Sequence, residues 1–519
     1  MKDLRNNTRR LLKLLAIFLC MLIFSSCANC VSCNFEDLFN IVVIDPTEND
    51  TEGDINQIPH ETQKQTTLFT EDITFEPPIP IGDLDFEGLE VHVTLPDSIN
   101  MHRGWYADEA VDELTEAIIN RNQKINEELN IDVKYDIASD VDPNFDTGII
   151  IADAATLSAL SIRDKLCNMQ DKKLFPYFDF AADCWHQSYI EACSVGKRMY
   201  MASGAVSLDV YDNAFAIFAN HDIYKEIRGE NDTRLMSDIA LEGRWTYDEM
   251  YKWAQIANDK GNVQGLAIDG ENLSRSDLAN AFRATWNVDF TVGKDLDTKL
   301  LPPDANSSQK FARLMSMFND KNILYNGTTS EFSNQKYLMF LTKIAPNDED
   351  VETRREIKSF EFYALLPLPK YNADQESYLT YVSDASFIGI DKSISSDKGV
   401  LISAYLQTIM HTSYWEVTGY YFNRTLKTKR IWIDDTDDRE LYHSSLIEIF
   451  DIMIKNIKFD FVDAYGSSIS DLHELWSTAF LQGLTPAEQF AAKSDRYQAT
   501  LDQVMRFFKE KNQCCTDSR

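Results

Sequence analysis

The order of strand and helix patterns along residues 89–151 constrains the fold of this chain most strongly. Residues 89–94 alternate between apolar and polar side chains, as a half-buried strand does. Apolar residues at steps of three, four, seven and four then mark one face of a helix between 111 and 129. Further apolar stretches at 131–137 and 148–151 predict two more strands. A strand, a helix and two strands in this order predict an α/β lobe.

A second set of such patterns begins with the apolar strand at 214–220. A helix follows at Thr246 and Glu249, which are spaced as a capping box, with Trp245 and Met250 placed as its hydrophobic staple. The chain has 519 residues, which is more than a single hydrophobic core usually holds. We therefore predict a second α/β lobe.

The remainder of the chain is predicted to add two strands and a helical end. The stretch at 362–370 is an apolar strand stopped by prolines, and 385–390 forms another strand. From 397 onward the pattern is mostly helical, with amphipathic stretches at 397–413, 438–456 and 486–509.

The first 26 residues predict an export signal. Among residues 1–13, five basic side chains oppose one acidic side chain, a net charge of +4. The apolar run at 14–24 has 11 residues, too short to span a bilayer but suited to a signal peptide. It ends in Phe24-Ser-Ser-Cys27, which resembles a bacterial lipobox with Cys27 as the acylated residue. Ordinary secretion with cleavage nearby is the alternative.

Residues 34–83 are rich in Thr, Asp, Glu, Asn and Pro without periodicity, which predicts a flexible tether. The run Cys27-x-x-Cys30-x-x-Cys33 lacks the fourth cysteine and proline of a ferredoxin motif, so we predict no metal there. Export permits a bridge between Cys184 and Cys193, but the sequence cannot fix the pairing.

The predicted division of the chain is a signal peptide at 1–26, a lipid-anchored tether at 27–83, the first part of lobe 1 at 84–210, mainly lobe 2 at 211–380, crossover segments and C-terminal helices that pack on both lobes at 381–510, and a tail at 511–519.

The charge of the chain excludes two kinds of partner. There are 83 acidic and 50 basic residues, a net charge of −33, and loss of residues 1–26 would leave −37. Nucleic-acid binding needs a basic surface that releases counterions from phosphate, so it is excluded. Adhesion to anionic lipid through a basic patch is excluded for the same reason.

Motifs of catalysis are absent from the sequence. It contains no G-x-S-x-G, H-E-x-x-H, Walker A or G-x-G-x-x-G motif, and its eight histidines show no metal-ligand spacing. The acidic run at 434–438 lacks the spacing of a calcium loop and predicts a solvated loop. We therefore predict no enzyme, no catalytic residue, no cofactor and no metal site. A carboxylate pair for glycoside hydrolysis is defined by distance, so an exported carbohydrate-active enzyme stays open as an alternative.

Five groups of residues carry a resemblance to a known family. They are Gly104-Trp-Tyr-Ala-Asp-Glu-Ala-Val with Arg121-Asn122, Asp183-Cys-Trp185 with Gly196-Lys-Arg-Met-Tyr200, Phe218-Ala-Asn220, Gly243-Arg-Trp-Thr246 and Leu366-Pro-Leu-Pro-Lys-Tyr371. In this order behind a lipobox, they resemble the extracellular solute-binding lipoproteins of bacterial ABC importers, of the carbohydrate-binding, family 1-like sort. The resemblance covers roughly residues 90–510. Here His186 follows Trp185, where the family often has a second aromatic residue.

The resemblance implies a two-lobed periplasmic-binding-protein-like fold of type II, α/β in class, with lobes joined by crossover segments and a helical C-terminal part. Such a protein binds its solute in the cleft and closes by hinge bending. It implies a monomer, anchored by lipid on the extracytoplasmic face of the cell membrane, that delivers a sugar or oligosaccharide to an ABC permease. Peptides or other solutes remain an alternative cargo, and a sensor or adhesin lipoprotein remains an alternative function.

A sugar site needs aromatic platforms and polar hydrogen-bonding groups. Trp105, Trp185 and Trp286 are aromatic candidates, and Tyr420 is a fourth, lying between Trp415 and Trp432. Two acidic candidates lie beside predicted strands, where open α/β sheets bind ligands: Asp153 and Asp384. For each of these residues, core packing or a helix cap is the alternative role.

Overall fold

The computed structural model describes residues 84–97, 101, 103–138, 148–229, 234–260, 263–320, 324–345, 363–425 and 437–513. The predicted signal peptide and tether lie outside these residues, and so do the proposed lipidation site Cys27, Trp432, most of the acidic run at 434–438 and most of the predicted tail.

Lobe 1 is built on a four-stranded sheet with the order β13-β3-β1-β2. β1 (Leu89–Pro96) pairs in parallel with β2 (Ile131–Ala138) and with β3 (Ile149–Asp153). β13 (Ser386–Ile390) returns from a distant part of the chain and pairs antiparallel to β3. All four strands lie at positions that the alternating and apolar patterns predict.

The helix α3 (Glu113–Leu129) connects β1 to β2 and buries the apolar face predicted from the sequence, with one exception. Asp112 caps the helix by accepting a hydrogen bond from the backbone N–H of Thr115, so Val111 falls before the first turn. Val111 is 72% exposed. Its inclusion in the apolar face was therefore wrong.

Further elements of lobe 1 surround this sheet and its edges. They are α4 (Ala154–Ile162), α5 (Gln187–Cys193), β4 (Ser194–Val195), β5 (Arg198–Met199), α14 (Ser396–Thr412), the π-helical turn η3 (Ser413–Val417), α15 (Thr418–Thr425), α17 (Phe461–Tyr465) and the 3₁₀ turn η5 (Gly466–Ile469). α14, η3 and α15 pack on α3, and α17 packs on α4 and α5.

Lobe 2 is built on a five-stranded mixed sheet with the order β10-β7-β11-β6-β12. β10, β7 and β11 are parallel to one another, whereas β6 runs antiparallel to both of its neighbours. The strands are β6 (Phe215–Asn220), β7 (Gln264–Asp269), β10 (Leu324–Gly327), β11 (Tyr337–Lys343) and β12 (Tyr363–Pro367).

Helices and small elements complete lobe 2. They are α7 (His221–Arg228), α8 (Met236–Leu241), α9 (Tyr247–Lys260), α10 (Arg275–Thr285), the β8–β9 ribbon (Thr291–Val292 and Lys299–Leu300) with the turn η2 (Asp295–Asp297), α11 (Ala305–Asn319) and α12 (Thr329–Ser333). At the start of α9, Thr246 accepts the N–H of Glu249 as the capping pattern predicts. The Glu249 carboxylate accepts from Trp253 and Lys252.

Three crossing segments lie side by side between the sheets, the first at 209–214, the second at 380–384 and the third at 457–460. After the short helix α6 (Asp209–Asp212), Ala214 bridges to Val382, and Thr380 bridges to Ile457. The helix α16 (Asp437–Lys455), which leads to Ile457, packs on α8 and β12 of lobe 2. After Ile457 the chain enters α17 on lobe 1, so this region joins the lobes.

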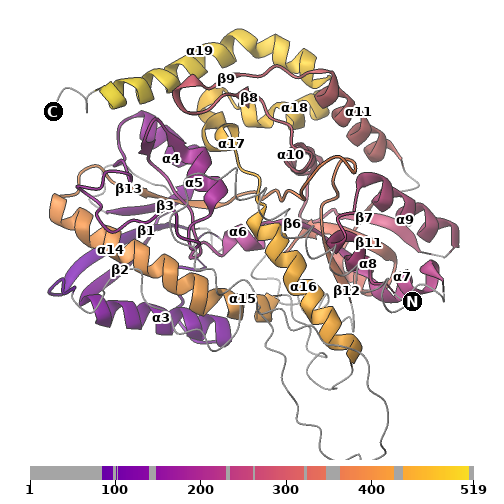
Figure 1. The fold of residues 1–519 in the computed structure, drawn as a ribbon, viewed down its shortest axis with the longest axis horizontal. Coiled ribbons are helices and arrows are strands. Elements are labelled where there is room, and N and C mark those ends of the chain that lie inside the picture. Colours follow the sequence, from indigo (N-terminus) through magenta and orange to yellow (C-terminus); the bar gives the residue numbers. More distant parts are fainter. Residues whose placement is uncertain are drawn as a thin grey trace, which may run out of the picture. The chain divides into compact units, whose positions relative to one another are not determined.

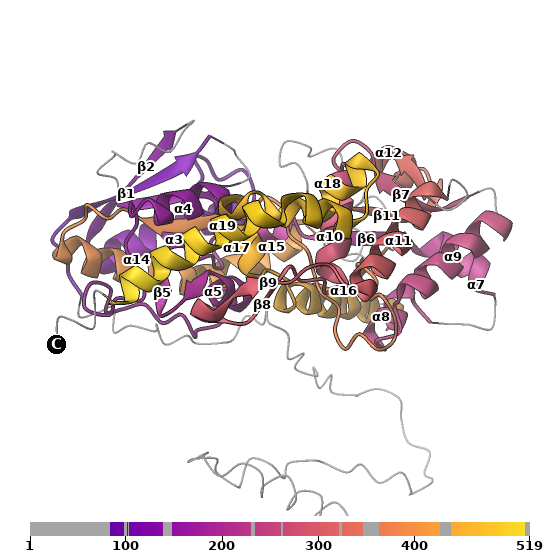
Figure 2. The ribbon, with the colours of Figure 1, turned by 90° about the horizontal axis from the view of Figure 1, so that it is seen from above.

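The C-terminal part is helical, as predicted. The turn η6 (Leu472–Glu474) and α18 (Leu475–Gln482) bring the chain back to α10, and α19 (Pro486–Gln513) ends it. α19 contacts α11 and β9 of lobe 2 and η5 of lobe 1, and Figures 1 and 2 show it running over both lobes. The buried apolar side chains form one continuous cluster through both lobes. The predicted α/β class, two lobes and crossover segments are confirmed.

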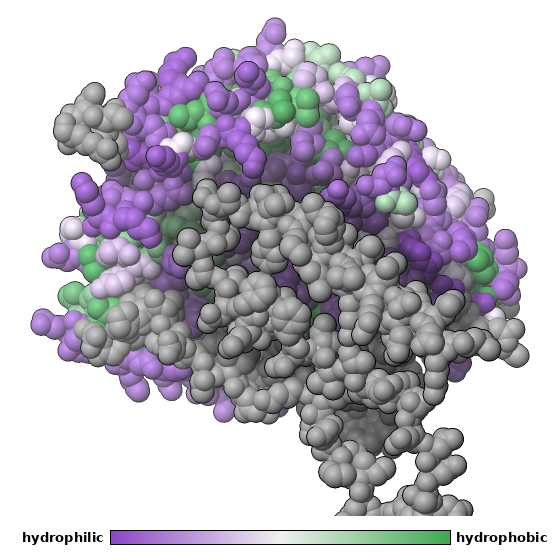
Figure 3. All heavy atoms as spheres, viewed as in Figure 1, coloured by the Kyte–Doolittle hydropathy of each residue, from purple (hydrophilic) through white to green (hydrophobic). Residues whose placement is uncertain are grey.

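The surface agrees with the acidic composition. On the face shown in Figure 3, the described surface is mostly hydrophilic and apolar residues occur in small groups. Across the described ranges, no helix has the length and apolar character needed to cross a membrane. Cys184 and Cys193 are both buried free thiols, so the bridge that the sequence left open is not formed.

Candidate functional site

A cavity of ≈ 500 Å³ lies at the boundary between the lobes. One wall comes from residues just before α5 and from its first turn in lobe 1, and a second comes from η3 and the start of α15, which α3 supports. The third wall is the last two turns of α16, a helix that packs on lobe 2. Tyr211 of the crossing helix α6 also lines it. A cavity of this size suits a small organic ligand.

Five of the thirteen lining residues carry a Trp, Tyr or Phe ring. Tyr414 and Trp415 come from the π-helical turn, with their rings edge to face and their centroids 4.8 Å apart. Phe450 belongs to the third wall, on α16, and its ring packs against Tyr211 at a centroid distance of 5.8 Å. Trp185 belongs to the first wall. Tyr414 and Trp415 are partly exposed and offer flat apolar surfaces to a ligand, whereas Trp185, Tyr211 and Phe450 are at most 3% exposed and belong mainly to the core.

Polar groups complete the lining. Asp183 is exposed at the wall before α5, while Asp451 and Lys455 form an ion pair one turn apart at 2.8 Å on α16. Burial raises the pKa of Tyr414 to about 12, and the nearby carboxylates of Asp183 and Asp451 act in the same direction. Tyr414 is therefore a neutral hydroxyl at physiological pH, able to donate a hydrogen bond to a ligand.

His186 is the one imidazole of this lining. Burial lowers its pKa to about 4, so the ring is neutral near pH 7. Its edge packs against Tyr189 and Tyr211. The other acidic and basic residues of the lining are two aspartates and one lysine.

Two buried carboxylates hold the crossing helix α6 in place beside the cavity. Asp212 accepts hydrogen bonds from Arg103 at 2.7 Å and from the hydroxyl of Tyr421 at 2.8 Å. Asp209 accepts the backbone N–H of Ser386 at 2.6 Å and its hydroxyl at 2.8 Å. Burial raises the pKa of Asp209 to about 7, although both hydrogen bonds from Ser386 oppose the shift. Asp209 thus ties the first crossing segment to the start of β13, and Asp212 ties it to Arg103 and to α15.

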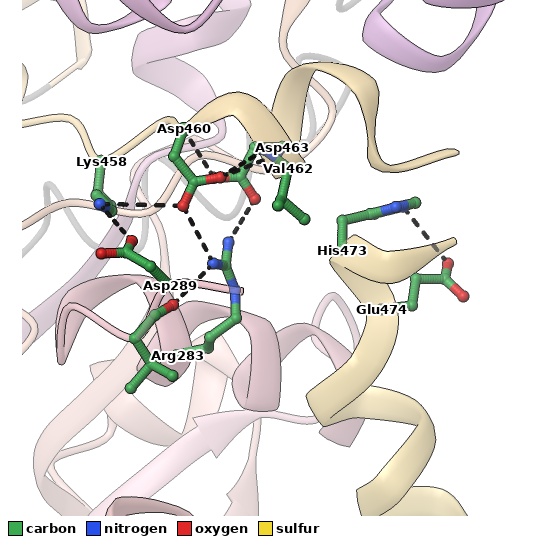
Figure 4. A network of polar contacts seen from close by, with 9 residues as sticks. Arg283, Asp289, Lys458, Asp460, Val462, Asp463, His473 and Glu474 are labelled. Atoms are coloured by element: carbon green, nitrogen blue, oxygen red, sulfur yellow. Dashed lines mark hydrogen bonds and ion pairs between the residues drawn. The ribbon is translucent and has the colours of Figure 1, made fainter. Parts of the chain in front are cut away.

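A buried ion cluster joins lobe 2 to α17 (Figure 4). The Arg283 guanidinium, 1% exposed on α10, pairs with Asp463 and lies 3.5 Å from Asp460. Lys458 pairs with Asp289 at 2.8 Å and lies 3.9 Å from Asp460. Burial acts to raise the pKa of Asp460, but Arg283 and Lys458 outweigh it and lower that pKa. The cluster fixes the third crossing segment to lobe 2.

Asp460 and Asp463 also form the N-terminal cap of α17. The carboxylate of Asp460 accepts the backbone N–H groups of Val462 at 2.8 Å and Asp463 at 3.1 Å. The carboxylate of Asp463 in turn accepts the N–H of Asp460 at 3.1 Å. Because the same carboxylates bind Arg283, the start of α17 is determined jointly by its own capping box and by lobe 2.

Of the six ligand-binding candidates from the sequence, Trp185 lines this cavity. It is 1% exposed, and its indole N–H donates to the Oε1 atom of Gln407 on α14 at 3.0 Å. The ring is thus held in lobe 1, where it packs edge to face against Phe178 and Phe180. Trp185 contributes an edge to the cavity and much of its area to the core.

The other aromatic candidates lie elsewhere. Trp286 is buried in lobe 2, where its indole N–H donates to the carbonyl of Pro369 at 3.2 Å. Trp105 is buried in lobe 1, and its carbonyl accepts from Arg121 and Asn122. Tyr420 is 43% exposed on α15. None of the three is among the described residues that line the cavity, and their contact with a ligand stays a prediction.

The acidic candidates are also placed apart from the cavity. Asp153 caps α4, accepting the N–H of Thr156 at 2.6 Å. Asp384 lies in the crossing segment with a φ of 50°, and its carboxylate is 3.3 Å from the ammonium group of Lys343. Among the described residues, no group of three His, Cys, Asp or Glu side chains could hold a metal ion.

Sequence reasoning missed most of the lining. The sequence analysis places Trp415 only beside the candidate Tyr420, and it assigns no role to Tyr211, Tyr414, Phe450 or Asp451. Polar residues around an aromatic pair, as in Ser413-Tyr-Trp-Glu416, were the available signal. The same pattern also occurs in helices whose aromatic residues only pack.

No protein-family model matches the chain. A search of curated proteins finds no match either. Among solved structures, uncharacterized protein lmo0859 from Listeria monocytogenes EGD-e has a TM-score of 0.50 at 13% identity, over 79% of this chain and 99% of that one. A cyclic alpha-maltosyl-1,6-maltose binding protein from Arthrobacter globiformis has a TM-score of 0.49 at 12% identity, over 80% and 99%. Maltose-bound MalE3 of T. maritima has a TM-score of 0.47 at 12% identity, over 81% and 99%.

These identities establish likeness of fold alone. The likeness to the Listeria protein extends over 79% of this chain, so it is not confined to one lobe. The chain therefore has the two-lobed periplasmic-binding-protein-like fold, of type II, that the sequence predicts.

Proposed function

We propose that this protein is a solute-binding protein, and not an enzyme, that captures a small ligand between its two lobes. The observation that carries the proposal is the cavity of ≈ 500 Å³ whose walls come from lobe 1 and from the lobe 2 helix α16. Because ligand contacts on both walls exist together only at one lobe angle, binding would favour that angle over others. A site of this kind converts ligand binding into a change of shape.

The lining favours a sugar or an oligosaccharide as the ligand. Aromatic rings such as Trp415 and Tyr414 suit the C–H faces of a pyranose, and Asp183 and Asp451 can accept hydrogen bonds from its hydroxyls. The motif resemblance to carbohydrate-binding lipoproteins supports the same class.

The export signal supports a role at the cell surface. In our proposal Cys27 carries the lipid anchor on the extracytoplasmic face of the cell membrane, and residues 27–83 let the lobes reach an ABC permease. The closed, ligand-bound monomer would then deliver the sugar to that permease.

A ligand screen by thermal unfolding tests the proposal. The chain without residues 1–26 would be heated with neutral mono- and oligosaccharides, with peptides and polyamines as comparison classes. A ligand present at 100 times its Kd stabilises the folded protein by about 2.7 kcal/mol, which raises the Tm measurably. We expect the shift to be confined to one class of sugar. A shift from peptides alone would reject the sugar assignment, and no shift from any class would reject the proposed function.

A further inference from the structure

The aromatic wall of the cavity stands on an unusual turn. Between α14 and α15 the helix changes to π geometry at Ser413–Val417, and the N–H of Thr418 donates to the carbonyl of Ser413, five residues back. The Thr418 hydroxyl donates to the same carbonyl at 3.1 Å. Tyr414, Trp415 and Thr418 all line the cavity. π-helical turns are rare, occur mostly as single turns inside α-helices, and are frequent at functional sites.

Arg121 supplies one such support. It is 1% exposed on α3, which lies beside α14 and α15 in Figure 1. Its Nη1 atom donates to the hydroxyl of Ser413 at 2.8 Å, and its Nη2 atom donates to the carbonyls of Gly104 at 2.8 Å and Trp105 at 3.0 Å. Nε and Nη2 also donate to Asn122 at 3.0 and 2.7 Å. One guanidinium thus joins α3, the 104–105 turn and the π-helical turn.

The oxygens that bind Arg121 are neutral, which makes its burial costly. They belong to carbonyl, hydroxyl and amide groups, while Glu416, the acidic residue of the π-helical turn, pairs at the surface with Lys124 at 2.7 Å. Replacing a buried ionic side chain by an apolar one of similar volume often leaves the stability of a protein unchanged or raises it. A planar guanidinium differs in fixing several acceptors in one geometry.

We propose that Arg121 is a positioning residue for the solute site, which through Ser413 fixes the π-helical turn that presents Tyr414 and Trp415 to the cavity. Arg121 is not among the cavity-lining residues, so it acts through the turn. The inference rests on the proposed function, because the wall that Arg121 positions is the wall of the proposed solute site.

Two neighbouring hydroxyl deletions test this role. Ser413→Ala removes the hydroxyl that accepts from Arg121 and donates to the carbonyl of Ile409 at 2.5 Å. Thr412→Ala removes a hydroxyl that donates to the carbonyl of Thr408 at 2.9 Å, the same kind of helix contact without Arg121. Ser413→Thr keeps a hydroxyl at the position as the conservative rescue. All three variants are made in the full chain, and their Tm values report the cost to stability.

The readouts are the environment of Trp415 and the ligand affinity. Labelling with 5-fluorotryptophan gives a fluorine NMR signal for each of the eight tryptophans, and Trp415→Phe assigns the signal of Trp415. We expect Ser413→Ala to shift this signal and to weaken binding of the best sugar from the screen about tenfold. We expect Thr412→Ala to lower Tm similarly without either effect, and Ser413→Thr to restore both.

A Ser413→Ala variant that resembles Thr412→Ala in signal and affinity would overturn the proposal, and so would a shifted signal with unchanged affinity. If the wild-type chain binds no solute of any class, the proposed function fails. The fluorine signal then still decides whether Arg121 and Ser413 position Trp415.

Discussion

Arg283 in lobe 2 forms a buried ion pair with Asp463, which lies in the first turn of α17 on lobe 1 (Figure 4). Asp460 and Lys458 extend the pair into a cluster along the third crossing segment. Separating these groups would leave charges buried without partners, so hinge bending between the lobes should keep the pair intact. The cluster is therefore expected to lie near the axis about which the lobes move.

Arg283→Ala should lower the free energy of unfolding by about 3–5 kcal/mol, because the carboxylates of Asp460 and Asp463 lose their buried partner. Urea denaturation of the two proteins measures the difference. Arg275→Ala is the matched control, since Arg275 is an exposed arginine on the same helix. We expect the control to change stability by less than about 0.5 kcal/mol. Equal effects of the two substitutions would show that the cluster contributes nothing specific.

Asp209 should make the protein less stable as the pH rises from about 4 to about 7. Burial raises its pKa from 3.8 to about 7 in the folded state, so over this range the folded protein holds a proton that the unfolded chain has lost. Stability falls with pH wherever the folded state binds more protons. The side chain in Asp209→Asn cannot ionise. The free energy of unfolding of the variant, relative to that of the wild type, should therefore be higher at pH 8 than at pH 4. Urea titrations at both pH values measure this gain.

Asp304 provides the control of opposite sign. Its pKa is lowered, first by the backbone hydrogen bond from Ser307 at the start of α11, so its contribution is present above about pH 4 and lost below it. The free energy of unfolding of Asp304→Asn, relative to that of the wild type, should therefore not rise between pH 4 and pH 8. If Asp209→Asn keeps a constant difference from the wild type across that range, Asp209 does not titrate as its burial predicts.

Regular elements were predictable because one segment contains the whole pattern. The apolar run at 214–220 became β6, and the amphipathic stretch at 486–509 became most of α19. Within such a segment, the period of the apolar residues and the capping side chains are enough to determine the element.

The cavity was not predictable in this way, because it forms where distant segments meet. Asp183, Trp415 and Phe450 approach one another only after both lobes and their connections have formed. The exposure of a single tryptophan is equally hard to predict from the sequence. Trp286 follows a helix in polar company, yet it is 0% exposed because Pro369 and Tyr371 of a later segment cover it.

Cys27→Ser should release the protein from membranes, since a serine cannot take the lipid that we propose for Cys27. Detergent phase partitioning of the full chain, expressed in a bacterium, measures the effect. We expect the wild type in the detergent phase and the variant in the aqueous phase. Cys30→Ser should behave as the wild type, because Cys30 lies beyond the lipobox. All three proteins in the aqueous phase would indicate secretion without an anchor, and all three in the detergent phase would show that attachment does not depend on Cys27.

Trp415→Ala should weaken binding of the sugar found in the thermal screen by about tenfold or more, equivalent to about 1.4 kcal/mol, because the ligand loses an aromatic platform. Trp415→Phe keeps a smaller ring, so its affinity for the sugar should lie between those of the wild type and Trp415→Ala. Tyr420→Ala is the matched comparison: Tyr420 belongs to the same helical segment, is 43% exposed and is not among the residues that line the cavity. Titration calorimetry gives the Kd of each. We expect Tyr420→Ala to stay within twofold of the wild type. A loss of affinity in Tyr420→Ala with none in Trp415→Ala would move the binding site away from the cavity and back to the residue chosen from the sequence.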